Sequence, residues 1–350
     1  MSFWHGKRVL LTGHTGFKGA WAARWLATMG ARVTGLALPP PAGPAIFAML
    51  GQEHLAASHL VDLRDLPAVE AVVRAVEPEI VLHMAAQPLV RLSYADPVGT
   101  FGTNVMGTVH LLDAVRRLAR PQAIVVVTSD KVYANDGSGR AYDEADRLEG
   151  HDPYSASKAA TEIVVASFRQ SYFFAAGVPL VTARGGNVIG GGDYSADRLV
   201  PDIVRALMAG KRPLLRNPES TRPWQHVLDC LDGYFSFAMA CATGRQVPSA
   251  LNFGPLPDAT AVTVAGLTRR MLAAFGHEAT FDLDPSEAPK EMRELAVSSA
   301  LAEETLGWRP CLTPEASIQL TADWYSAQSS SADMAQVTDR QIKAYRDLRS

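Results

Sequence analysis

The chain has 350 residues, which suits one large two-lobed domain or two closely packed ones. Its 33 lysines and arginines nearly balance 36 acidic residues, and the net charge of -3 disfavours nucleic acid and anionic membranes as partners. No stretch approaches the roughly 20 apolar residues that cross a bilayer. The N-terminus lacks the apolar core of a signal peptide, and three scattered cysteines show no metal-binding spacing, so we expect a cytoplasmic protein without a bound metal.

The N-terminal half alternates short β-rich runs with helical patterns, which predicts an α/β fold with a parallel sheet wrapped by helices. The expected strands lie near residues 8–12, 32–37, 60–62, 79–84, 123–128 and 179–183. The expected helices between them lie near residues 17–29, 65–76, 98–118 and 154–175.

After about residue 184, glycine clusters and prolines interrupt the pattern and the elements become short. Helices are expected near residues 200–209, 227–242, 260–275, 298–306 and 314–327. A region of this kind usually supplies specificity loops on a rigid scaffold. Residues 328–350 are polar and are expected to form a linker and a surface helix.

A glycine-spaced turn follows the first expected strand and opens the first expected helix. In this turn Gly13 permits a tight bend, Gly16 lets the backbone approach a pyrophosphate, and Gly19 allows close contact between helix and strand. The helix N-terminus then offers free N–H groups and a favourable dipole to phosphates. The turn therefore predicts a dinucleotide site, although the spacing alone also fits a plain glycine-rich turn.

Recognition of the adenosine end of the cofactor is less clear from the sequence. The second strand ends at Leu38 without the acidic residue that usually grips the ribose, so this feature does not distinguish NAD from NADP. Asp62 follows the third strand and either reaches the adenine amino group or caps the next helix. Ala85, Ala86 and Gln87 are expected to line the cofactor cleft, where small side chains permit close approach.

Two further segments carry acid–base side chains. Residues 128–131, Thr-Ser-Asp-Lys, close an apolar run that is expected to be a strand. Tyr154 and Lys158 are four residues apart, so a helix places both on one face. A cation beside a phenol favours the phenolate, which predicts that Lys158 lowers the pKa of Tyr154 from about 10 toward neutrality. Tyr154 is then a base for a substrate hydroxyl; the alternative is an ordinary exposed Tyr/Lys pair.

Together these motifs resemble the extended short-chain dehydrogenase/reductase superfamily. More narrowly, segments 13–19, 128–131, 186–193 and 222–227 resemble the CDP-D-glucose 4,6-dehydratase family, and the likeness runs from residue 3 to about 326. It implies NAD as the cofactor and a hydro-lyase reaction on CDP-D-glucose: oxidation at C4, elimination of water across C5 and C6, and hydride return to C6. The product, CDP-4-dehydro-6-deoxy-D-glucose, would feed the synthesis of deoxysugars such as those of O-antigen lipopolysaccharide.

The resemblance also assigns roles to single residues. Tyr154 takes the C4 hydroxyl proton, Lys158 assists it and orients the nicotinamide ribose, and Ser129 hydrogen-bonds the C4 oxygen. Asp130 protonates the departing C6 hydroxyl. Lys131 stands where related dTDP-glucose dehydratases carry a glutamate that serves as the C5 base. A lysine acts as a base only when neutral, and the alternatives are that it pairs with Asp130 or stabilises the enolate as a cation.

The resemblance implies a Rossmann-type doubly wound sheet with a smaller mixed C-terminal lobe. We assign residues 1–183, with return segments near 225–255, to the dinucleotide-binding domain, residues 184–327 to the nucleotide-sugar lobe, and residues 328–350 to a partly helical polar tail. The residues expected to bind the cofactor are Gly13, His14, Thr15, Gly16, Phe17, Lys18, Gly19, Asp62, Leu63, Ala85, Ala86, Gln87, Thr128, Tyr154 and Lys158.

On the substrate side, guanidinium groups match phosphate oxygens in pairs, which makes arginines the main candidates for a diphosphate. The residues expected to bind substrate are Arg91, Asn187, Arg198, Arg216, Arg222, His226 and Arg293. The alternative for His226 is a purely structural role, and the alternative for Arg198 is a surface ion pair.

Two other functions remain open at this stage. The first alternative is another nucleotide-sugar dehydratase or 4-epimerase of the superfamily. The second is a non-catalytic dinucleotide-binding sensor or scaffold. The intact Ser129-Asp130-Lys131 and Tyr154/Lys158 sets argue against the second, because a binding module has no need of them. Related enzymes imply a homodimer in which helices 98–118 and 154–175 pair across a two-fold axis.

Overall fold

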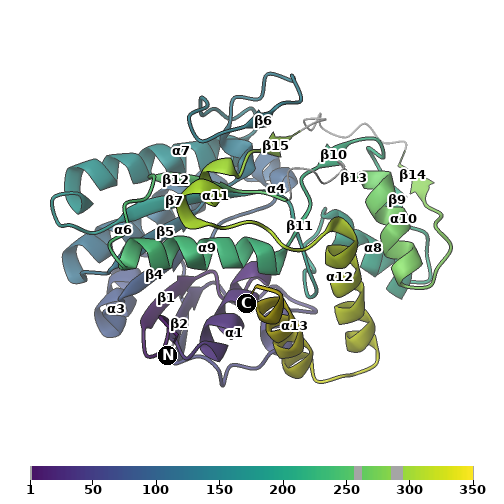
Figure 1. Ribbon diagram of the computed structural model, residues 1–350, viewed down its shortest axis with the longest axis horizontal. Coiled ribbons are helices and arrows are strands. Elements are labelled where there is room, and N and C mark those ends of the chain that lie inside the picture. The colour runs from purple at the N-terminus through teal and green to yellow at the C-terminus, as the bar shows by residue number, and fades with distance from the viewer. Residues whose placement is uncertain (1, 256–261, 285–294, 350) are drawn as a thin grey trace.

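The computed structural model describes residues 2–255, 262–284 and 295–349 (Figure 1). Its centre is a parallel sheet of seven strands in the order β12-β7-β5-β4-β1-β2-β3. The strands are β1 (Arg8–Thr12), β2 (Arg32–Ala37), β3 (Ala57–Leu60), β4 (Ile80–His83), β5 (Ala123–Val127), β7 (Leu180–Gly185) and β12 (Ala250–Phe253). This is the doubly wound order of a Rossmann fold, and it confirms the predicted fold class.

The chain reverses its winding direction between β1 and β4, which are neighbours in the sheet, with Leu11 opposite Leu82. In such folds ligands bind beyond the carboxyl ends of the strands at this switch point. The site is therefore expected where the turn after β1 meets the segments after β4 and β5.

Apolar side chains alternate between the two faces of β1, so each face is covered by helices. Val9 and Leu11 join the cluster under α1 (Phe17–Thr28) and α9 (Val227–Ala242). Leu10 joins the cluster under α3 (Leu66–Val76), α6 (Gly107–Leu118) and α7 (Pro153–Phe168). The remaining helical elements of this domain are α2 (Ile46–Met49), α4 (Val90–Ala95), α5 (Pro97–Phe101), η1 (Gly102–Met106), η2 (Asp130–Val132) and η3 (Arg169–Phe173).

The predicted helices and all but one of the predicted strands of this half lie within a few residues of their expected positions. The exception is β3, which spans 57–60 rather than 60–62. It is the edge strand and pairs only with β2, with Thr34 opposite Ala57 and Ala37 opposite Leu60. The side chains of β3 are half-buried or exposed, so the apolar residues Leu60 and Val61 do not mark the centre of this strand.

The smaller lobe consists of short elements to one side of the sheet (Figure 1). Its helices are α8 (Leu199–Met208), α10 (Val264–Ala274) and α12 (Pro314–Ser329), whereas α11 (Ala300–Leu306) packs on β12 and α9 of the first domain (Figure 1). Two-stranded pairs join β6 (Ala141–Tyr142) with β15 (Ala296–Val297), β8 (Val188–Ile189) with β11 (Gln225–His226), β9 (Leu214–Leu215) with β14 (Asp282–Leu283), and β10 (Thr221–Arg222) with β13 (Val262–Thr263). The helix expected at 260–275 begins at Val264, because Thr263 caps it by accepting from the N–H of Gly266 at 3.0 Å.

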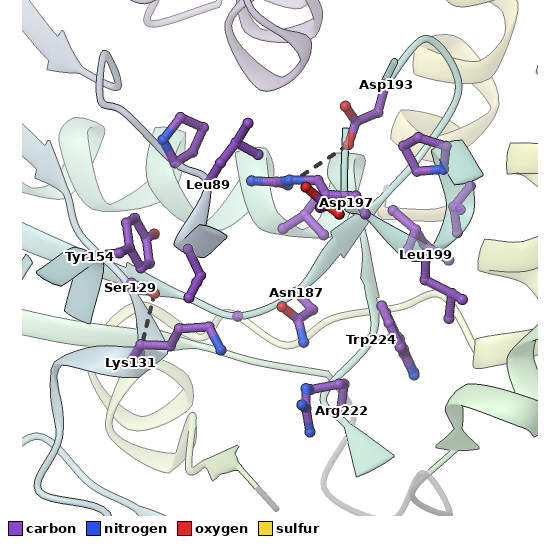
Figure 2. Close-up of a pocket in the computed structure, with 18 of the residues that line it drawn as sticks. Leu89, Ser129, Lys131, Tyr154, Asn187, Asp193, Asp197, Leu199, Arg222 and Trp224 are labelled. Carbon is purple, nitrogen blue, oxygen red and sulfur yellow. Dashed lines mark hydrogen bonds and ion pairs between the residues drawn. The ribbon is translucent and has the colours of Figure 1, made fainter. Parts of the chain in front are cut away.

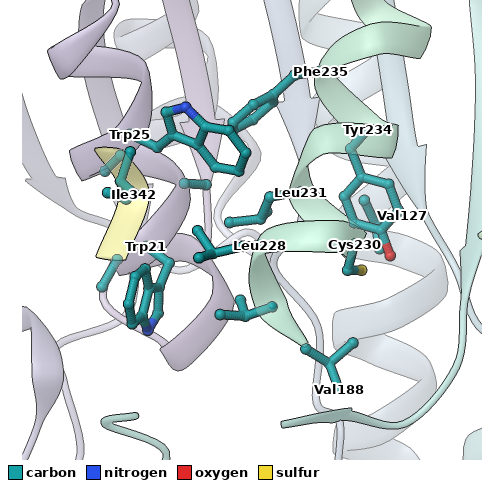
Figure 3. Close-up of a cluster of buried hydrophobic side chains, with 14 of the residues drawn as sticks. Trp21, Trp25, Val127, Val188, Leu228, Cys230, Leu231, Tyr234, Phe235 and Ile342 are labelled. Carbon is teal, nitrogen blue, oxygen red and sulfur yellow. The ribbon is translucent and has the colours of Figure 1, made fainter. Parts of the chain in front are cut away.

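The polar segment after residue 328 turns back onto the first domain as α13 (Met334–Arg349). Figure 3 shows Ile342 of this helix beside Trp21 and Trp25 of α1. Tyr345 is buried and donates a 2.8 Å hydrogen bond to Asp229 of α9. The tail thus covers the outer side of the helix that follows the glycine turn. In the described part of the chain, no helix combines the length and apolar character needed to cross a bilayer.

Candidate active site

A cavity of about 390 Å³ opens at the carboxyl ends of the central strands, between the two lobes. Ser129, Lys131 and Tyr154 line it from the sheet side, and Asn187 and Arg222 line it from the smaller lobe (Figure 2). The cavity therefore lies where the switch point of the sheet predicts a ligand.

The glycines of the turn have three different physical reasons to be glycine. Gly13 has φ +80°, and a Cβ there would stand 2.9 Å from Ala85 Cα after β4. A Cβ on Gly19 would collide with the carbonyl oxygen of Gly13. Gly16 has no such neighbour, since the nearest atom would be 3.4 Å away. The open space over Gly16 and the uncapped N-terminus of α1 fit a pyrophosphate held by backbone N–H groups.

The side chains of this turn separate into two groups. His14 points into the core, where its Nε2 lies 2.8 Å from Ser58 Oγ and burial lowers its pKa to about 4. Only the backbone of His14 is therefore available to a cofactor, and the predicted contact of His14 with the cofactor would run through it. Thr15 donates to the Leu38 carbonyl at 2.9 Å. Lys18 lines the cavity, with its Nζ 5.8 Å from the centre of the Tyr234 ring.

At the adenosine end, the capping alternative for Asp62 is wrong. Asp65 is the residue that caps α3, accepting from the N–H of Ala68. The Asp62 carboxylate instead pairs with Arg64 at 2.6 Å, and this pairing lowers its pKa. A contact from Asp62 to adenine stays a prediction. Leu63 is buried, so it offers no side chain to a ligand.

The segment after β4 forms one wall of the cofactor cleft, but its three predicted residues differ in role. Ala86 lines the cavity. Ala85 packs against the glycine turn, and its N–H donates to Thr12 at 3.0 Å. The Gln87 side chain turns into the protein and donates to Thr100 at 2.9 Å, so it shapes the loop rather than facing a ligand.

Tyr154 and Lys158 lie in the first turns of α7, as predicted. Asp152 caps this helix, and Pro153 occupies its first position. Both side chains are almost fully buried, which excludes the alternative of an exposed pair. Lys158 donates to the carbonyl of Val127 at the end of β5, at 3.1 Å.

The predicted lowering of the Tyr154 pKa is not found. Burial raises the pKa of Tyr154, and a hydrogen bond with Ser129 and the charge of Arg198 offset this only in part. Lys158 itself is shifted strongly: burial, helped by repulsion from Lys18, lowers its pKa to about 7. Lys158 is thus better described as a group that exchanges protons near neutrality than as a permanent cation.

Ser129, Asp130 and Lys131 follow β5 in one short 3-10 turn. Ser129 donates to Asp130 Oδ1 at 3.0 Å and accepts from the N–H of Lys131 at 3.2 Å. Asp130 is buried, which raises its pKa, and its Oδ2 has no hydrogen-bond partner among the described residues. A buried carboxyl group with one open oxygen at a cavity wall is a suitable proton donor.

A buried ion pair behind this turn was missed by the sequence reasoning. Glu162, one helical turn after Lys158, contacts both Arg184 and Thr128, with 2.9 Å between Arg184 Nη2 and Glu162 Oε2 and a 2.5 Å hydrogen bond from Thr128. The four-residue spacing of Tyr154, Lys158 and Glu162 was the available signal. The pair fixes Thr128, and with it the start of the Ser129–Lys131 turn.

Most of the predicted substrate-binding residues are brought together at the cavity. Those that line it are Arg91, Asn187, Arg198, Arg216 and Arg222. His226 does not line it: this side chain is buried, caps α9 by accepting from the N–H of Leu228 at 3.3 Å, and has its pKa lowered by burial to about 3. Arg293 lies outside the described residues.

The fold and the site define a class. A Rossmann sheet with a glycine turn after β1, a Ser-Asp-Lys turn after β5 and a Tyr-x-x-x-Lys helix beside one cavity is the arrangement of an extended short-chain dehydrogenase/reductase. Residues 10–321 match the family model described as GDP-mannose 4,6 dehydratase, and the chain belongs to that family.

Individual relatives agree with this assignment. The chain is 43% identical to the CDP-glucose 4,6-dehydratase of Salmonella typhimurium strain LT2, over 98% of this chain and 97% of that protein. Among solved structures, it is similar to TunA, an NAD-dependent NDP-hexosamine 5,6-dehydratase, with a TM-score of 0.76, 26% identity and coverage of 92% of this chain and 98% of that one. A dTDP-glucose 4,6-dehydratase from Streptomyces venezuelae shares the fold, with a TM-score of 0.80, 24% identity and coverage of 94% and 99%.

The buried Lys158 makes a prediction about stability. Below pH 7 both the folded and the unfolded chain hold its proton, and the folded chain bears the full cost of a buried ammonium group. Between about pH 7 and pH 10.4 only the unfolded chain is protonated, so the wild-type protein gains stability as pH rises. We expect Lys158→Met to be more stable than wild type at pH 6 and this difference to shrink by about 2–3 kcal/mol by pH 9.

Urea unfolding at several pH values measures this difference, with the exposed Lys211→Met as a matched control. A difference between wild type and Lys158→Met that does not change with pH would contradict the assignment.

Proposed function

We propose that this protein is an NAD-dependent dehydratase that converts CDP-D-glucose to CDP-4-dehydro-6-deoxy-D-glucose. The observation that carries the proposal is the Asp130 carboxyl group, buried with one open oxygen at the cavity wall, next to Lys131 and close to Tyr154. An oxidoreductase that only moves a hydride has no need of this second acid–base pair. The relative named CDP-glucose 4,6-dehydratase, which matches nearly the whole chain, supports the choice of substrate.

The residues of the glycine turn fit a dinucleotide. The open space over Gly16 and the free N–H groups of α1 would hold the pyrophosphate, and the wall at Ala86 would face the nicotinamide end. The NAD dependence of TunA supports the same cofactor. When bound, NAD supplies the reversible two-electron oxidation that the reaction requires.

The protein's part in the oxidation step is to remove the C4 hydroxyl proton. Burial raises the pKa of the Tyr154 phenol and keeps it protonated at rest. Tyr154 must therefore pass the phenol proton to a neighbouring base before it can accept a proton from the C4 hydroxyl. Lys158, one helical turn away with a pKa of about 7, is the residue we propose for this role. Ser129 can hydrogen-bond the C4 oxygen from the opposite side. The resulting ketone then acidifies the proton on C5.

The elimination step needs an acid for the C6 hydroxyl and a base for the C5 proton. Asp130 is the acid, because burial raises its pKa and leaves it protonated more readily than an exposed carboxyl group. Lys131 lines the same cavity and is the proposed base. The charge of Lys131 also acts on Asp130, where it offsets part of the rise in the pKa of that carboxyl group, so pairing with Asp130 stays the alternative to the role of base.

The reaction is tested by incubating the protein with NAD and CDP-glucose and following the alkali-induced absorbance of a 4-keto sugar. Turnover of another nucleotide sugar, but not of CDP-glucose, would select a different dehydratase or epimerase. Binding of NAD without turnover of any nucleotide sugar would select the sensor or scaffold.

Replacement of Lys131 separates the two chemical steps. We expect Lys131→Met to retain cofactor binding and C4 oxidation but to slow elimination by roughly 10²–10⁴, the usual contribution of a positioned acid or base. Single-turnover reduction of NAD reports the first step, and solvent deuterium exchange at C5 reports the second. Exchange at the wild-type rate would show that Lys131 is not the base, and Lys211→Met is the control for loss of a lysine elsewhere.

We infer that the protein forms a homodimer through the helical runs α5-η1-α6 and α7-η3. Large apolar side chains project from these runs, including Val98 and Ile163, which are 83% and 65% exposed. Others on the same runs are Phe101, Met106 and Tyr172. Residues of α5 and η1 pack beside α7, so these side chains belong to neighbouring elements of one layer. The expected cytoplasmic location stays a prediction.

The dimer prediction can be checked by light scattering. A carboxylate buried without a partner is strongly unfavourable, so Ile163→Glu should shift the protein toward a monomer. Leu348→Glu on α13 is the matched control, because Leu348 is 66% exposed and lies on another surface. Equal dimer content in both variants would exclude this face.

A further inference from the structure

One carboxylate joins the two lobes across the cavity. Asp197, in the loop before α8, accepts from Arg91 of α4 at 3.2 Å and from Arg216, just after β9, at 3.1 Å. Both arginines donate to the same oxygen, Oδ1. All three residues line the cavity, and Figure 2 shows Asp197 at its edge, across from Tyr154.

The loop holds Asp197 in an unusual backbone conformation. Its φ is +56°, in the left-handed region that non-glycine residues seldom adopt. The loop is anchored on the N-terminal side of Asp197, where buried Asp193 accepts from the N–H of Ser195 at 3.0 Å. On the other side Arg198 lies 3.8 Å from Asp193. The ion pairs with Arg91 and Arg216 offset the conformational cost of Asp197.

A ligand anion can replace Asp197 in these ion pairs at little cost. The side chains of Arg91, Asp197 and Arg216 are 39%, 38% and 25% exposed, and pairs of this kind contribute little individually. A single carboxylate oxygen serves two guanidinium groups, whereas a diphosphate offers several oxygens and can satisfy both in bidentate geometry. A diphosphate placed between these arginines would therefore compete directly with Asp197.

We propose that Asp197 is an internal anion that holds Arg91 and Arg216 until the diphosphate of a nucleotide sugar displaces it. The inference rests on the proposed function for the identity of the ligand, but its mechanism needs only the diphosphate.

Asp197→Asn tests the competition, because asparagine keeps the shape of the side chain and tolerates the left-handed backbone. Calorimetric titration of the full chain with inorganic pyrophosphate and with CDP should show binding roughly 2- to 30-fold tighter than in wild type, the range expected for two partly exposed ion pairs. Cytidine, which has no phosphate, should bind equally to both proteins. Asp282→Asn is the matched control, since Asp282 forms an exposed pair with Arg212 and neither residue lines the cavity.

A second variant separates this competition from a general change in charge. In an Arg216→Gln background, the gain from Asp197→Asn should become smaller, because one of the displaced pairs no longer exists. An unchanged or weaker affinity of Asp197→Asn for pyrophosphate would overturn the proposal, as would a gain of full size in the Arg216→Gln background. A pyrophosphate effect without turnover of CDP-glucose would overturn only the proposed substrate.

Discussion

The hydrogen bond from Lys158 to the carbonyl of Val127 is the interaction on which the site depends. It ties the first turns of α7 to the last residue of β5, and the Ser129–Lys131 turn begins two residues later. Tyr154 and the Asp130/Lys131 pair therefore share one cavity although they are more than twenty positions apart in the chain. This contact is one of the ties that hold the two acid–base groups in a common geometry.

This geometry is reinforced by a second layer of buried polar contacts. Glu162 joins α7 to Thr128 and to Arg184 on the neighbouring strand β7. A buried ion pair costs desolvation and stabilises a fold only when its partners are fully hydrogen-bonded. Here Glu162 accepts from Thr128, Thr182 and Arg184, so its carboxylate is well satisfied. The polar network thereby fixes Thr128, which immediately precedes the Ser129–Lys131 turn.

Burial also determines the chemistry. It raises the pKa of Asp130 and of Tyr154 and lowers that of Lys158, so each group is pushed toward its neutral form. A neutral carboxyl group at Asp130 can donate a proton and a neutral amine at Lys158 can accept one, whereas an exposed aspartate and an exposed lysine are both charged near neutral pH. On the substrate side the arginines of the cavity are only half-buried, so an incoming anion can reach them.

The sequence by itself determined the class of fold, the glycine turn and the acid–base set. Each of these is carried by residues that are close together in the chain: a strand followed by Gly13, or Tyr154 and Lys158 one helical turn apart. These features can therefore be predicted from the sequence without knowledge of the fold. The edge strand β3 was misplaced because only one neighbour constrains it.

Only the tertiary structure decided the direction of the Tyr154 pKa, the core position of His14 and His226, the docking of α13 and the bridge made by Asp197. All of these depend on what surrounds a side chain, and the surroundings come from distant parts of the chain. Desolvation has no signature in a local pattern, so burial reversed the expectation for Tyr154. The arginines that Asp197 joins lie 106 and 19 positions away from it, and only the folded chain brings their charges together.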